Sequence, residues 1–449
     1  MNDLKIGFSR VNITPPLGID VSGYYVPRIA DGILDELEIN CIALEQNGKR
    51  ALMLSFDLLQ MKDDCTNTVK NAVMAATGVD EQAIYLHSTH THTGPAIVAI
   101  GDNAEKIQKY LDFLTQRAAD VSVMALADLT PCKMGYGTGT APNIAFVRRF
   151  RMKDGSIRTN PGVNNPDIVA PMGDVDESVN VLRFDREDGQ TIISVNFGDH
   201  PDVVGGTKIS GDWPALTRKV VEKTLDNTKC IVFNGCEGDV NHVNVFPTGG
   251  YLNGMFMDFD DVSRGYDHSL YMARVITGGV LQAFDKVKYC DNTELNYHQK
   301  KITLASNMAD PKDLPEAHRI NDLHLAGKDD EIGAEGMMLT TIVAEAARMV
   351  RLENGPESFE MTLSGISLGP VAFIGFPGEP FTGIGRGVKE YDGFELVMHT
   401  CLTNGCSGYF PMTDAYTEGG YEAKSSIFKA GVAESLITEG INVLKELNK

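Results

Sequence analysis

Residues 83–95 read AIYLHSTHTHTGP, a short apolar strand pattern that runs directly into two histidines spaced two apart. Upstream, ALMLSFD (51–57) has the same apolar character, and residues 66–76 between the two stretches have a helical pattern. Apolar residues at helical spacing return over 105–127. This alternation of strand and helix predicts an α/β fold in which helices cover a sheet.

Turn signals indicate that the sheet is mixed. QNGK (46–49) and REDGQ (186–190) are typical of hairpins, which join antiparallel strands. Further strands are expected at 191–197, 229–234, 360–367, 370–376 and 395–400, and further helices near 213–225, 265–284, 334–352 and 427–447. No repeat or linker divides the chain, so residues 1–449 are expected to form a single domain.

Two long loops are expected, over 241–265 and 400–425, because these stretches are rich in Gly, Tyr and Asn. Long ordered loops within compact domains are commonly functional. We therefore expect both loops to lie near a site.

The composition is that of an acidic globular protein. The chain has 449 residues, with 40 Lys and Arg against 61 Asp and Glu, a net charge of −21, and 43% hydrophobic residues. The acidic excess repels phosphate backbones and no basic run offsets it, so nucleic-acid binding is not expected. No apolar run approaches the ~18 residues of a membrane span, so no transmembrane segment is expected.

The N-terminal sequence and the cysteines predict the location. The opening MNDLKIGFSRVNITPP contains no basic stretch followed by an apolar one, so we recognise no secretory signal peptide. The eight cysteines have no paired spacing, as is typical of reduced thiols. A cytoplasmic location is therefore expected.

Residues able to bind a metal cluster just beyond the ends of the predicted buried strands. They are His90 and His92 after 83–89, His200 after 191–197, Glu237, Asp239 and His242 after 229–234, and Glu379 after 370–376. Because the carboxyl ends of strands in an open α/β sheet meet at one crevice, we expect these side chains to share a site. Two histidines, a carboxylate and an open position form the ligand set of hydrolytic zinc.

Several of these residues have more than one interpretation. Side chains two apart in an extended segment point to the same side, so His90 and His92 can share one metal, or one can bind it while the other acts as acid or base. The pair can also simply form turn hydrogen bonds beside Gly94 and Pro95. Asp57, at the end of its strand, can contact a metal or a ligating histidine, or cap the next helix.

Six short motifs occur in a fixed order along the chain. They are NITPP near the start, THTHTGP at 89–95, NFGDHP at 196–201, EGDVN at 237–241, PGEP at 377–380, and a Tyr-rich loop at 409–421. Together they resemble the neutral/alkaline, non-lysosomal ceramidase family, from about residue 5 to the C-terminus. The resemblance is to that family's catalytic domain only, because the chain leaves no room for its C-terminal immunoglobulin-like domain.

The resemblance implies a ligand set for zinc and a set of residues that act on the substrate. The positions that match the family's zinc ligands are His90, His200, Glu379 and Tyr409. Tyr409, Tyr416 and Tyr421 keep the family's spacing of three tyrosines. The positions that match its substrate-side residues are His92, which hydrogen-bonds substrate or moves its proton, Tyr421, which polarises the scissile carbonyl, and Arg148, which lies in the pocket.

One position departs from the family. Ceramidases read GDVSPN where this chain reads GDVNHV, so Asn241 replaces a serine proposed as a nucleophile in some members. Asparagine cannot serve as that nucleophile, which leaves attack by metal-activated water. Asn241 is then expected at most to donate a hydrogen bond to the oxyanion, and His242 is a candidate substitute proton carrier.

These observations predict a zinc-dependent hydrolase that cleaves a carbon–nitrogen amide bond in a small-molecule or lipid substrate. The composition contains no lipid-specific signal, so two alternatives stay open. One is a metallohydrolase of the same fold that cleaves an ester, a lactone or a small polar amide, including a sugar-linked one. The other is a metal-binding protein without turnover.

Overall fold

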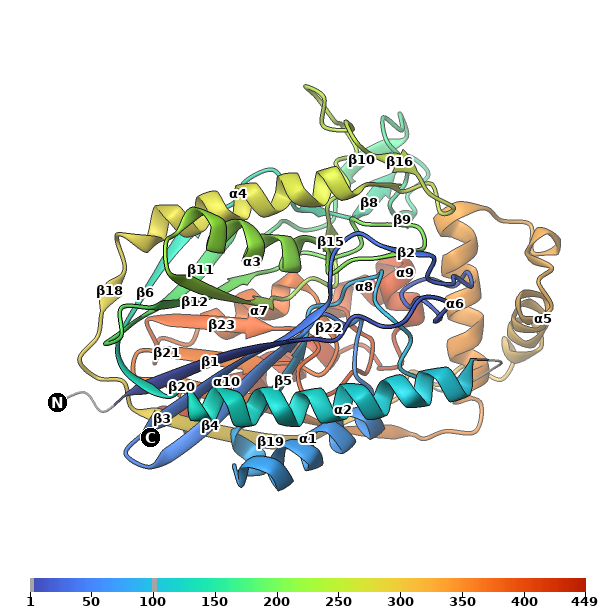
Figure 1. Cartoon of the computed structure of the whole chain (residues 1–449). Helices are drawn as coiled ribbons and strands as arrows, with labels where there is room; N and C mark the ends of the chain where they lie inside the picture. The colour runs from blue at the N-terminus through green and yellow to red at the C-terminus, as the bar shows by residue number, and fades with distance from the viewer. Residues whose placement is uncertain (1–3, 99–102) are drawn as a thin grey trace.

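The computed structural model describes residues 4–98 and 103–449, and its centre is a nine-stranded mixed sheet (Figure 1). In sheet order the strands are β14 (Thr228–Asn234), β12 (Thr191–Phe197), β11 (Ser178–Arg186), β6 (Thr130–Thr140), β1 (Lys5–Asn12), β3 (Glu38–Gln46), β4 (Lys49–Phe56) and β5 (Ile84–Ser88), with β18 (Lys288–Tyr289) beside β6. β12 and β14 pair in parallel, as do β4 and β5, while the other neighbours are antiparallel. The predicted mixed sheet is confirmed.

A second, four-stranded sheet packs face to face against the first. Its order is β19 (Leu295–Ala305), β20 (Ser358–Leu368), β21 (Val371–Gly375) and β23 (Leu396–Thr400). Phe233 of β14 and Phe373 of β21 meet edge to face with ring centroids 5.5 Å apart, and Tyr85 of β5 contacts both rings. This apolar interface explains why strands of both sheets read as nearly continuous hydrophobic runs.

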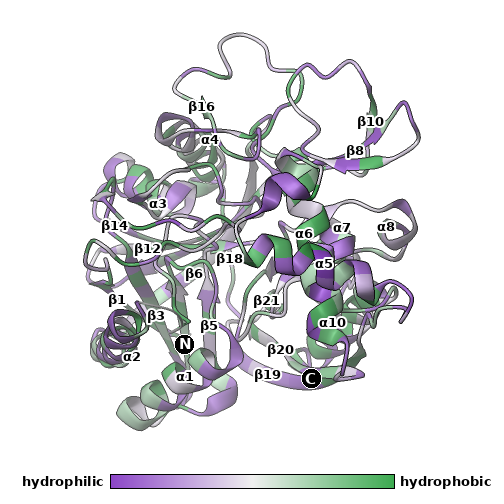
Figure 2. Ribbon diagram, turned by 90° about the vertical axis from the view of Figure 1, so that its right-hand side faces the viewer, coloured by the Kyte–Doolittle hydropathy of each residue, from purple (hydrophilic) through white to green (hydrophobic). Residues whose placement is uncertain are grey.

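Helices cover the outer faces of both sheets. α2 packs on β1 and β3, α3 on β14, and α4 on β6 and β11, whereas α10 covers β19, β20 and β21. Figure 2 shows these two groups on opposite sides of the sheets. The helices are α1 (Asp63–Thr77), α2 (Ala104–Ala127), α3 (Asp212–Thr224), α4 (Tyr266–Phe284), α5 (Leu314–Leu325), α6 (Gly336–Leu352), α7 (Thr382–Lys389), α8 (Thr413–Glu418), α9 (Tyr421–Ser425) and α10 (Val432–Leu447), with single turns at Glu81–Ala83 and Asp329–Glu331. Within the described residues no helix is long and apolar enough to cross a membrane.

The two expected loops contain short ordered elements. Five small ladders complete the fold: β8 (Arg149–Met152) with β9 (Ile157–Thr159) and β10 (Ile168–Pro171), β2 (Gly32–Ile33) with β13 (Lys208–Ile209), β7 (Phe146–Val147) with β15 (Val240–Asn241), β16 (Phe256–Met257) with β17 (Ser263–Arg264), and β22 (Glu379–Pro380) with β24 (Tyr409–Phe410). The stretch 241–265 thus holds β16 and β17, and the stretch 400–425 holds β24, α8 and α9. The assignment of residues 1–449 to one domain stays a prediction, and residues 1–3 and 99–102 of it lie outside the described residues.

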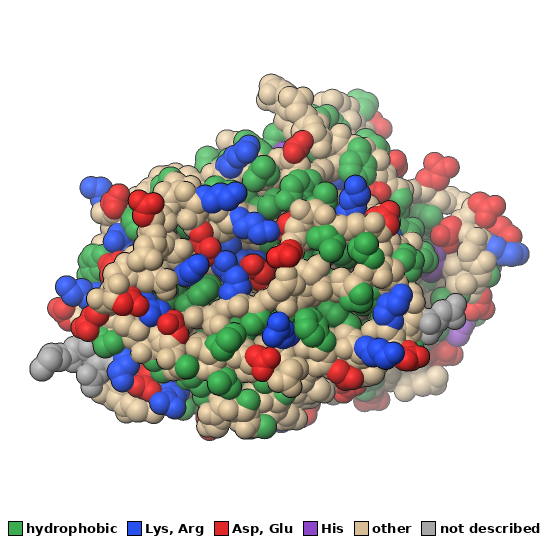
Figure 3. Space-filling view, in the orientation of Figure 1, with side chains coloured by type: hydrophobic (Ala, Val, Ile, Leu, Met, Phe, Trp, Pro, Cys, Tyr) green, Lys and Arg blue, Asp and Glu red, His purple; other side chains and the backbone are tan. Residues whose placement is uncertain are grey.

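The outer surface mixes charges of both signs. Figure 3 shows Lys and Arg side chains interspersed with Asp and Glu, with apolar side chains in small groups between them. This face therefore presents no broad field of a single sign that would steer a charged partner.

The two ends of the nine-stranded sheet approach each other through side chains, although no ladder pairs β14 with β5 among the described residues. Ser55 of β4 donates a hydrogen bond to the carbonyl of Val232 in β14, with an O···O distance of 2.7 Å. The amide of Asn234, at the end of β14, donates to Nε2 of His87 in β5 over 3.1 Å. Burial lowers the pKa of His87 to about 3, which keeps this imidazole neutral and able to accept.

Asn234 connects four segments at this meeting point. Its side-chain amide donates to the carbonyl of Thr89, and its side-chain oxygen accepts the amide of Asp199, both over 3.2 Å. Its own carbonyl accepts the amide of Cys401 over 3.1 Å. Because Asn234 is fully buried, each of these groups depends on it for its hydrogen bond.

Asp57 is neither a metal contact nor a helix cap. Its carboxylate forms a two-pronged ion pair with Arg218 of α3, at 2.5 and 3.0 Å, and also accepts the amide of Glu38. α1 begins only at Asp63. The buried pair fixes the end of β4, and the two residues that follow Asp57 are the ones that hold His90.

We expect Asn234→Ala to lower the free energy of unfolding by about 2–4 kcal/mol, because the Thr89 carbonyl and the Asp199 amide would lose their buried partner. Urea denaturation measures this change. Asn71→Ala, at an exposed position of α1, is the matched control and should change it by less than about 0.5 kcal/mol. A loss for Asn234→Ala as small as that of the control would contradict the role assigned to this residue.

Candidate metal centre

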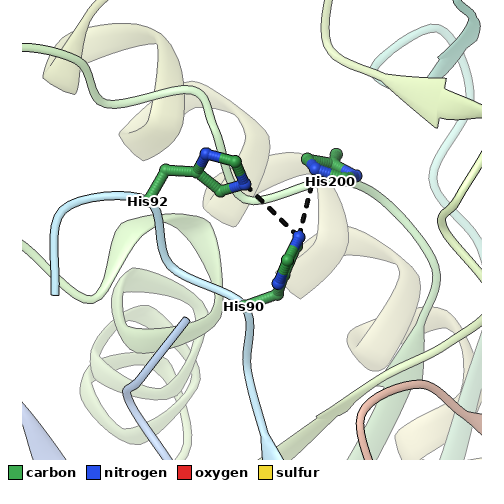
Figure 4. A group of neighbouring side chains, drawn as sticks. All are labelled: His90, His92 and His200. Atoms are coloured by element: carbon green, nitrogen blue, oxygen red, sulfur yellow. Dashed lines mark hydrogen bonds between the residues drawn. The ribbon is translucent and has the colours of Figure 1, made fainter. Parts of the chain in front are cut away.

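Three imidazoles converge beyond the ends of β5 and β12. Nε2 of His90 lies 3.1 Å from Nε2 of His200 and 3.3 Å from Nε2 of His92. Figure 4 shows the three rings pointing toward one another from two separate chain segments. The strand-end positions predicted from the sequence therefore meet in space.

Two carboxylates complete the group. Glu379 Oε2 lies 3.4 Å from Nε2 of His90 and 4.0 Å from Nε2 of His200. Glu237 Oε2 lies 2.8 Å from the other ring nitrogen of His200, Nδ1. Glu379 reaches the centre from β22, beside the second sheet, whereas the histidines come from the first. The site therefore receives side chains from both sheets.

The hydrogen bonds of the rings leave lone pairs facing one another. Nδ1 of His90 lies 2.8 Å from the carbonyl of Leu59, and Nδ1 of His200 faces Glu237, so both Nδ1 atoms act as donors. Their Nε2 atoms then present lone pairs toward each other and toward Glu379. Such a set of buried acceptors repels itself unless a cation sits among them, and His, His and Glu suit a divalent ion. The buried His and Glu group can therefore hold a metal ion.

The pKa values of His90 and His92 also indicate that the cluster favours one added positive charge. Burial lowers the pKa of His90, but the charges of Glu379 and Glu237 outweigh burial and raise it to about 9. Burial and the neighbouring His90 and His200 hold the pKa of His92 well below its usual value. The cluster thus attracts one positive charge, which a proton on His90 or a bound cation supplies.

The backbone around these histidines is tightly constrained. His90 has a φ of +77°, in the left-handed region that non-glycine residues rarely adopt, and its amide is held by the carbonyl of Leu58. Strain of this kind is concentrated at functional sites. Gly23, with a φ of +116°, lies against His92: a Cβ there would meet Nδ1 of His92 at 2.8 Å. Position 23 therefore needs glycine, because a side chain there would collide with His92.

Tyr409 reaches the centre through strand pairing. β22 and β24 form a parallel ladder in which Glu379 and Tyr409 are direct register partners. The Tyr409 hydroxyl hydrogen-bonds the Glu379 carboxylate. Burial and the charge of Glu379 raise the pKa of Tyr409 well above its usual value, so the phenol stays protonated unless a cation favours the phenolate.

Comparison with solved structures supports this picture. The crystal structure of neutral ceramidase from Pseudomonas aeruginosa matches 100% of this chain and 75% of that chain, with a TM-score of 0.74 and 14% sequence identity. A ceramidase complexed with C2 matches 99% of this chain and 76% of that chain, with a TM-score of 0.73 and 16% identity. This chain has the neutral ceramidase fold. No family model and no curated protein sequence matches it.

The ceramidase likeness predicted from the six motifs is thus confirmed at the level of the fold, including the mixed sheet flanked by helices. The last described helix, α10, packs on the second sheet, and the described residues contain no immunoglobulin-like unit. The roles assigned to individual residues by that resemblance stay predictions, and they can be compared with where the structure places each side chain.

Tyr421 and Arg148 lie beside Tyr409. The rings of Tyr409 and Tyr421 are 5.5 Å apart, and the guanidinium of Arg148 lies 5.4 Å from the centre of the Tyr409 ring. Arg148 donates to Glu422 over 2.7 Å and to the carbonyl of Gly238 over 2.8 Å. Burial, with Tyr25 and Glu379, raises the pKa of Tyr421 well above its usual value, so its hydroxyl keeps the proton that a donor needs.

Asn241 and His242 lie outside this group. Asn241 is fully buried, donates to the side-chain oxygen of Asn160 over 3.1 Å, and accepts the amide of Val243. His242 is held between Asp202, at 3.3 Å, and the carbonyl of Ser263, at 2.7 Å. Both polar ends of Asn241 are therefore occupied within the protein, and it reaches the pocket only through Asn160.

A small pocket opens beside the histidines and shows what the sequence analysis missed. Its cavity of about 50 Å³ is lined by five residues that the sequence analysis singled out, His92, His200, Arg148, Tyr409 and Tyr421, and also by Gly23, Tyr24, Tyr25, Asn160, Asp202, Phe259, Asp260, Arg264, Met337 and Thr340. The second set comes from irregular loops and from α6. No spacing or strand-end pattern marks these residues in the sequence.

We expect Glu237→Gln to weaken zinc binding by about 10–100-fold, because the residue facing Nδ1 fixes the orientation and basicity of His200. Isothermal titration calorimetry of the full chain with zinc measures the affinity. Glu105→Gln, an exposed change of the same type in α2, should leave it unaltered. Equal affinities for both variants would show that Glu237 does not support the ligand.

Proposed function

We propose that this protein is a zinc-dependent hydrolase of a carbon–nitrogen amide bond. The observation that carries the proposal is the meeting of His90, His200 and Glu379 around one point, beside a pocket, in a chain with the neutral ceramidase fold. Ceramidases cleave an amide bond, and the solved neighbours carry that name. Fold likeness alone does not define a reaction, so the proposal rests on the site.

In this proposal His90, His200, Glu379 and Tyr409 hold the zinc ion. The ion supplies Lewis acidity, which lowers the pKa of water and polarises a carbonyl. Structural zinc sites are usually closed by four Cys or His ligands, whereas this set borders a pocket that a substrate can enter. The mixed ligand set therefore favours catalysis over a purely structural ion.

The protein's own groups would move the protons. His92 lies in the pocket with its Nε2 3.3 Å from Nε2 of His90, so it is placed to take a proton from the attacking water and pass it to the leaving nitrogen. The water oxygen bonds to the carbonyl carbon, the carbon–nitrogen bond breaks, and the nitrogen departs with its electron pair and the transferred proton. The products are a carboxylate and an amine.

Two neighbouring groups would stabilise the charge on the carbonyl oxygen. Tyr421 lines the pocket and its raised pKa keeps its hydroxyl protonated, so it can donate a hydrogen bond to a carbonyl oxygen there. Arg148 contributes positive charge, and its bonds to Glu422 and Gly238 hold it rigidly beside Tyr409. A preorganised donor and cation of this kind are what a developing oxyanion requires.

We expect the double variant His200→Ala, Glu379→Gln to lose both zinc and amide hydrolysis. Each substitution removes a proposed ligand, and two remaining ligands bind zinc weakly. Metal analysis after dialysis, with the His318→Ala variant as a control at an exposed histidine, measures the occupancy. Zinc retained at the wild-type level in the double variant would refute the ligand assignment.

We expect His92→Ala to keep zinc but to lower kcat by about 10²–10⁴-fold, which is the usual contribution of a general acid or base. Steady-state kinetics and metal analysis on the same preparation separate the two possible roles. Loss of zinc would instead make His92 a third imidazole ligand, which its 3.3 Å distance from Nε2 of His90 also allows. Unchanged kcat with zinc retained would remove His92 from the mechanism.

A further inference from the structure

Asn160 is a largely buried amide side chain in the wall of the small cavity beside the histidines. It directly follows β9, is only 9% exposed, and lines this cavity together with Arg148 and Tyr421. Asn160 borders a neighbouring cavity as well, but of the two cavities Arg148 and Tyr421 line only the first. Asn160 therefore shares that cavity with the two groups proposed to stabilise the carbonyl oxygen.

The orientation of the Asn160 side chain follows from a backbone donor. The amide of Val243 can only donate, and it donates to Oδ1 of Asn241 over 3.0 Å. Nδ2 of Asn241 is therefore turned the other way, and it donates to Oδ1 of Asn160 over 3.1 Å. Turning either side chain over would bring two donors or two acceptors face to face in a buried place, which is costly.

This chain of hydrogen bonds leaves Nδ2 of Asn160 without a partner. Among the described residues, no atom accepts a hydrogen bond from it. A largely buried amide nitrogen without an acceptor is unfavourable, and an acceptor atom of a ligand in the cavity would satisfy it. A donor that is held unpaired in this way suits an oxygen atom that gains negative charge during a reaction.

Glu422 connects Asn160 rigidly to Arg148 and Tyr421. Its Oε1 accepts from Arg148 over 2.7 Å, and its Oε2 accepts from Oγ1 of Thr159 over 2.9 Å. Thr159 directly precedes Asn160, and its Oγ1 also accepts the amide of Tyr421 over 3.2 Å. The amide of Asn160 donates to the carbonyl of Arg148 over 2.8 Å. The three groups are thus held through one fully buried carboxylate, which gives the fixed geometry that stabilisation of an oxyanion requires.

We propose that Asn160 is a catalytic residue whose Nδ2 donates a hydrogen bond to the carbonyl oxygen of the substrate, and that Asn241 is the positioning residue that fixes this orientation. The inference rests on the proposed amide hydrolysis and deepens it. When water adds to the carbonyl carbon, the π electron pair moves onto the oxygen and the hydrogen bond strengthens. When the carbon–nitrogen bond breaks, the pair returns to the carbonyl, and Asn160 neither gains nor loses a proton.

Kinetics of the zinc-loaded full chain test the role of Asn160, with N-hexanoyl sphingosine in detergent, N-acetyl glucosamine and N-acetyl methionine as probes. Asn160→Gly removes the donor at a φ of +46° that glycine adopts freely, and Asn160→Asp keeps the oxygen that Asn241 binds but has no donor. We expect both variants to lower kcat on a hydrolysed probe by about 10²–10³-fold with KM nearly unchanged, because the lost bond forms mainly in the transition state.

Asn164 provides the matched control. It is exposed, lies in the same loop between β9 and β10, and has a φ of +55°. We expect Asn164→Gly and Asn164→Asp to leave kcat unchanged. If Asn160→Gly does not fold, Asn160→Asp decides. A folded Asn160 variant with the kcat of its Asn164 counterpart overturns the proposal and leaves amide hydrolysis standing.

Asn241→Asp tests the positioning role without changing a residue of the cavity wall. Aspartate still accepts the amide of Val243, but it cannot donate to Asn160, so the Asn160 side chain would turn over and lose its free donor. We expect kcat to fall by at least about tenfold, and to fall little further when the change is added to Asn160→Gly. Equal losses in both backgrounds would show that Asn241 does not act through Asn160. Asn241→Ser, which has no amide, serves if Asn241→Asp does not fold.

Calorimetry with butylphosphonate, a tetrahedral anion like the oxyanion intermediate, separates this inference from the proposed function. If the zinc-loaded wild-type protein hydrolyses none of the three probes, the proposed function is overturned, and binding of the phosphonate decides the inference. Binding to Asn160→Gly that is at least about tenfold weaker than binding to Asn164→Gly supports it. Equal binding to both variants, or no binding to the wild-type protein, overturns it.

Discussion

The candidate centre depends on the contact between the two ends of the first sheet at Asn234. This single buried residue binds the strand end of β5 through His87, the loop of His90 through Thr89, and the residue before His200 through Asp199. Its carbonyl also holds Cys401, which follows β23 of the second sheet. All of these bonds are made by the side-chain amide and the backbone of Asn234, in a site without water access. The groups that they hold are therefore fixed relative to one another. The positions of the two histidines relative to each other follow from these bonds.

Charge arrangement provides the second constraint. Two carboxylates and three imidazoles are buried together, and the cluster is stable only with added positive charge. A few ångströms away the charges are already balanced, because Arg264 pairs with Asp260 and Arg148 pairs with Glu422. The demand for a cation is therefore confined to the histidines and Glu379.

Sequence reasoning found the residues that follow strands and missed those held by irregular loops. His90, His200 and Glu379 were predictable because each comes directly after an apolar stretch, and the strands at 51–57, 83–89, 191–197 and 229–234 are present as β4, β5, β12 and β14. Tyr409 was reached only through the family resemblance, since its register with Glu379 cannot be seen in local sequence. The curvature of the sheet was not predictable either, because it depends on side chains of β4, β5 and β14 meeting across a distance of more than a hundred residues. Tyr24 and Gly23 have no periodicity and become visible only once His92 is in place.

The pairing of Glu379 with Tyr409 has a consequence for how the molecule behaves as a whole. One rung of a two-residue ladder supplies the ligands from the side of the second sheet, while the histidines belong to the first. An ion bound among them would link the two sheets, which otherwise contact each other through apolar packing and a few polar contacts. Binding of the ion would then couple the unfolding of the two sheets. Without the ion, cooperative unfolding of the two sheets would be lost before their secondary structure is lost.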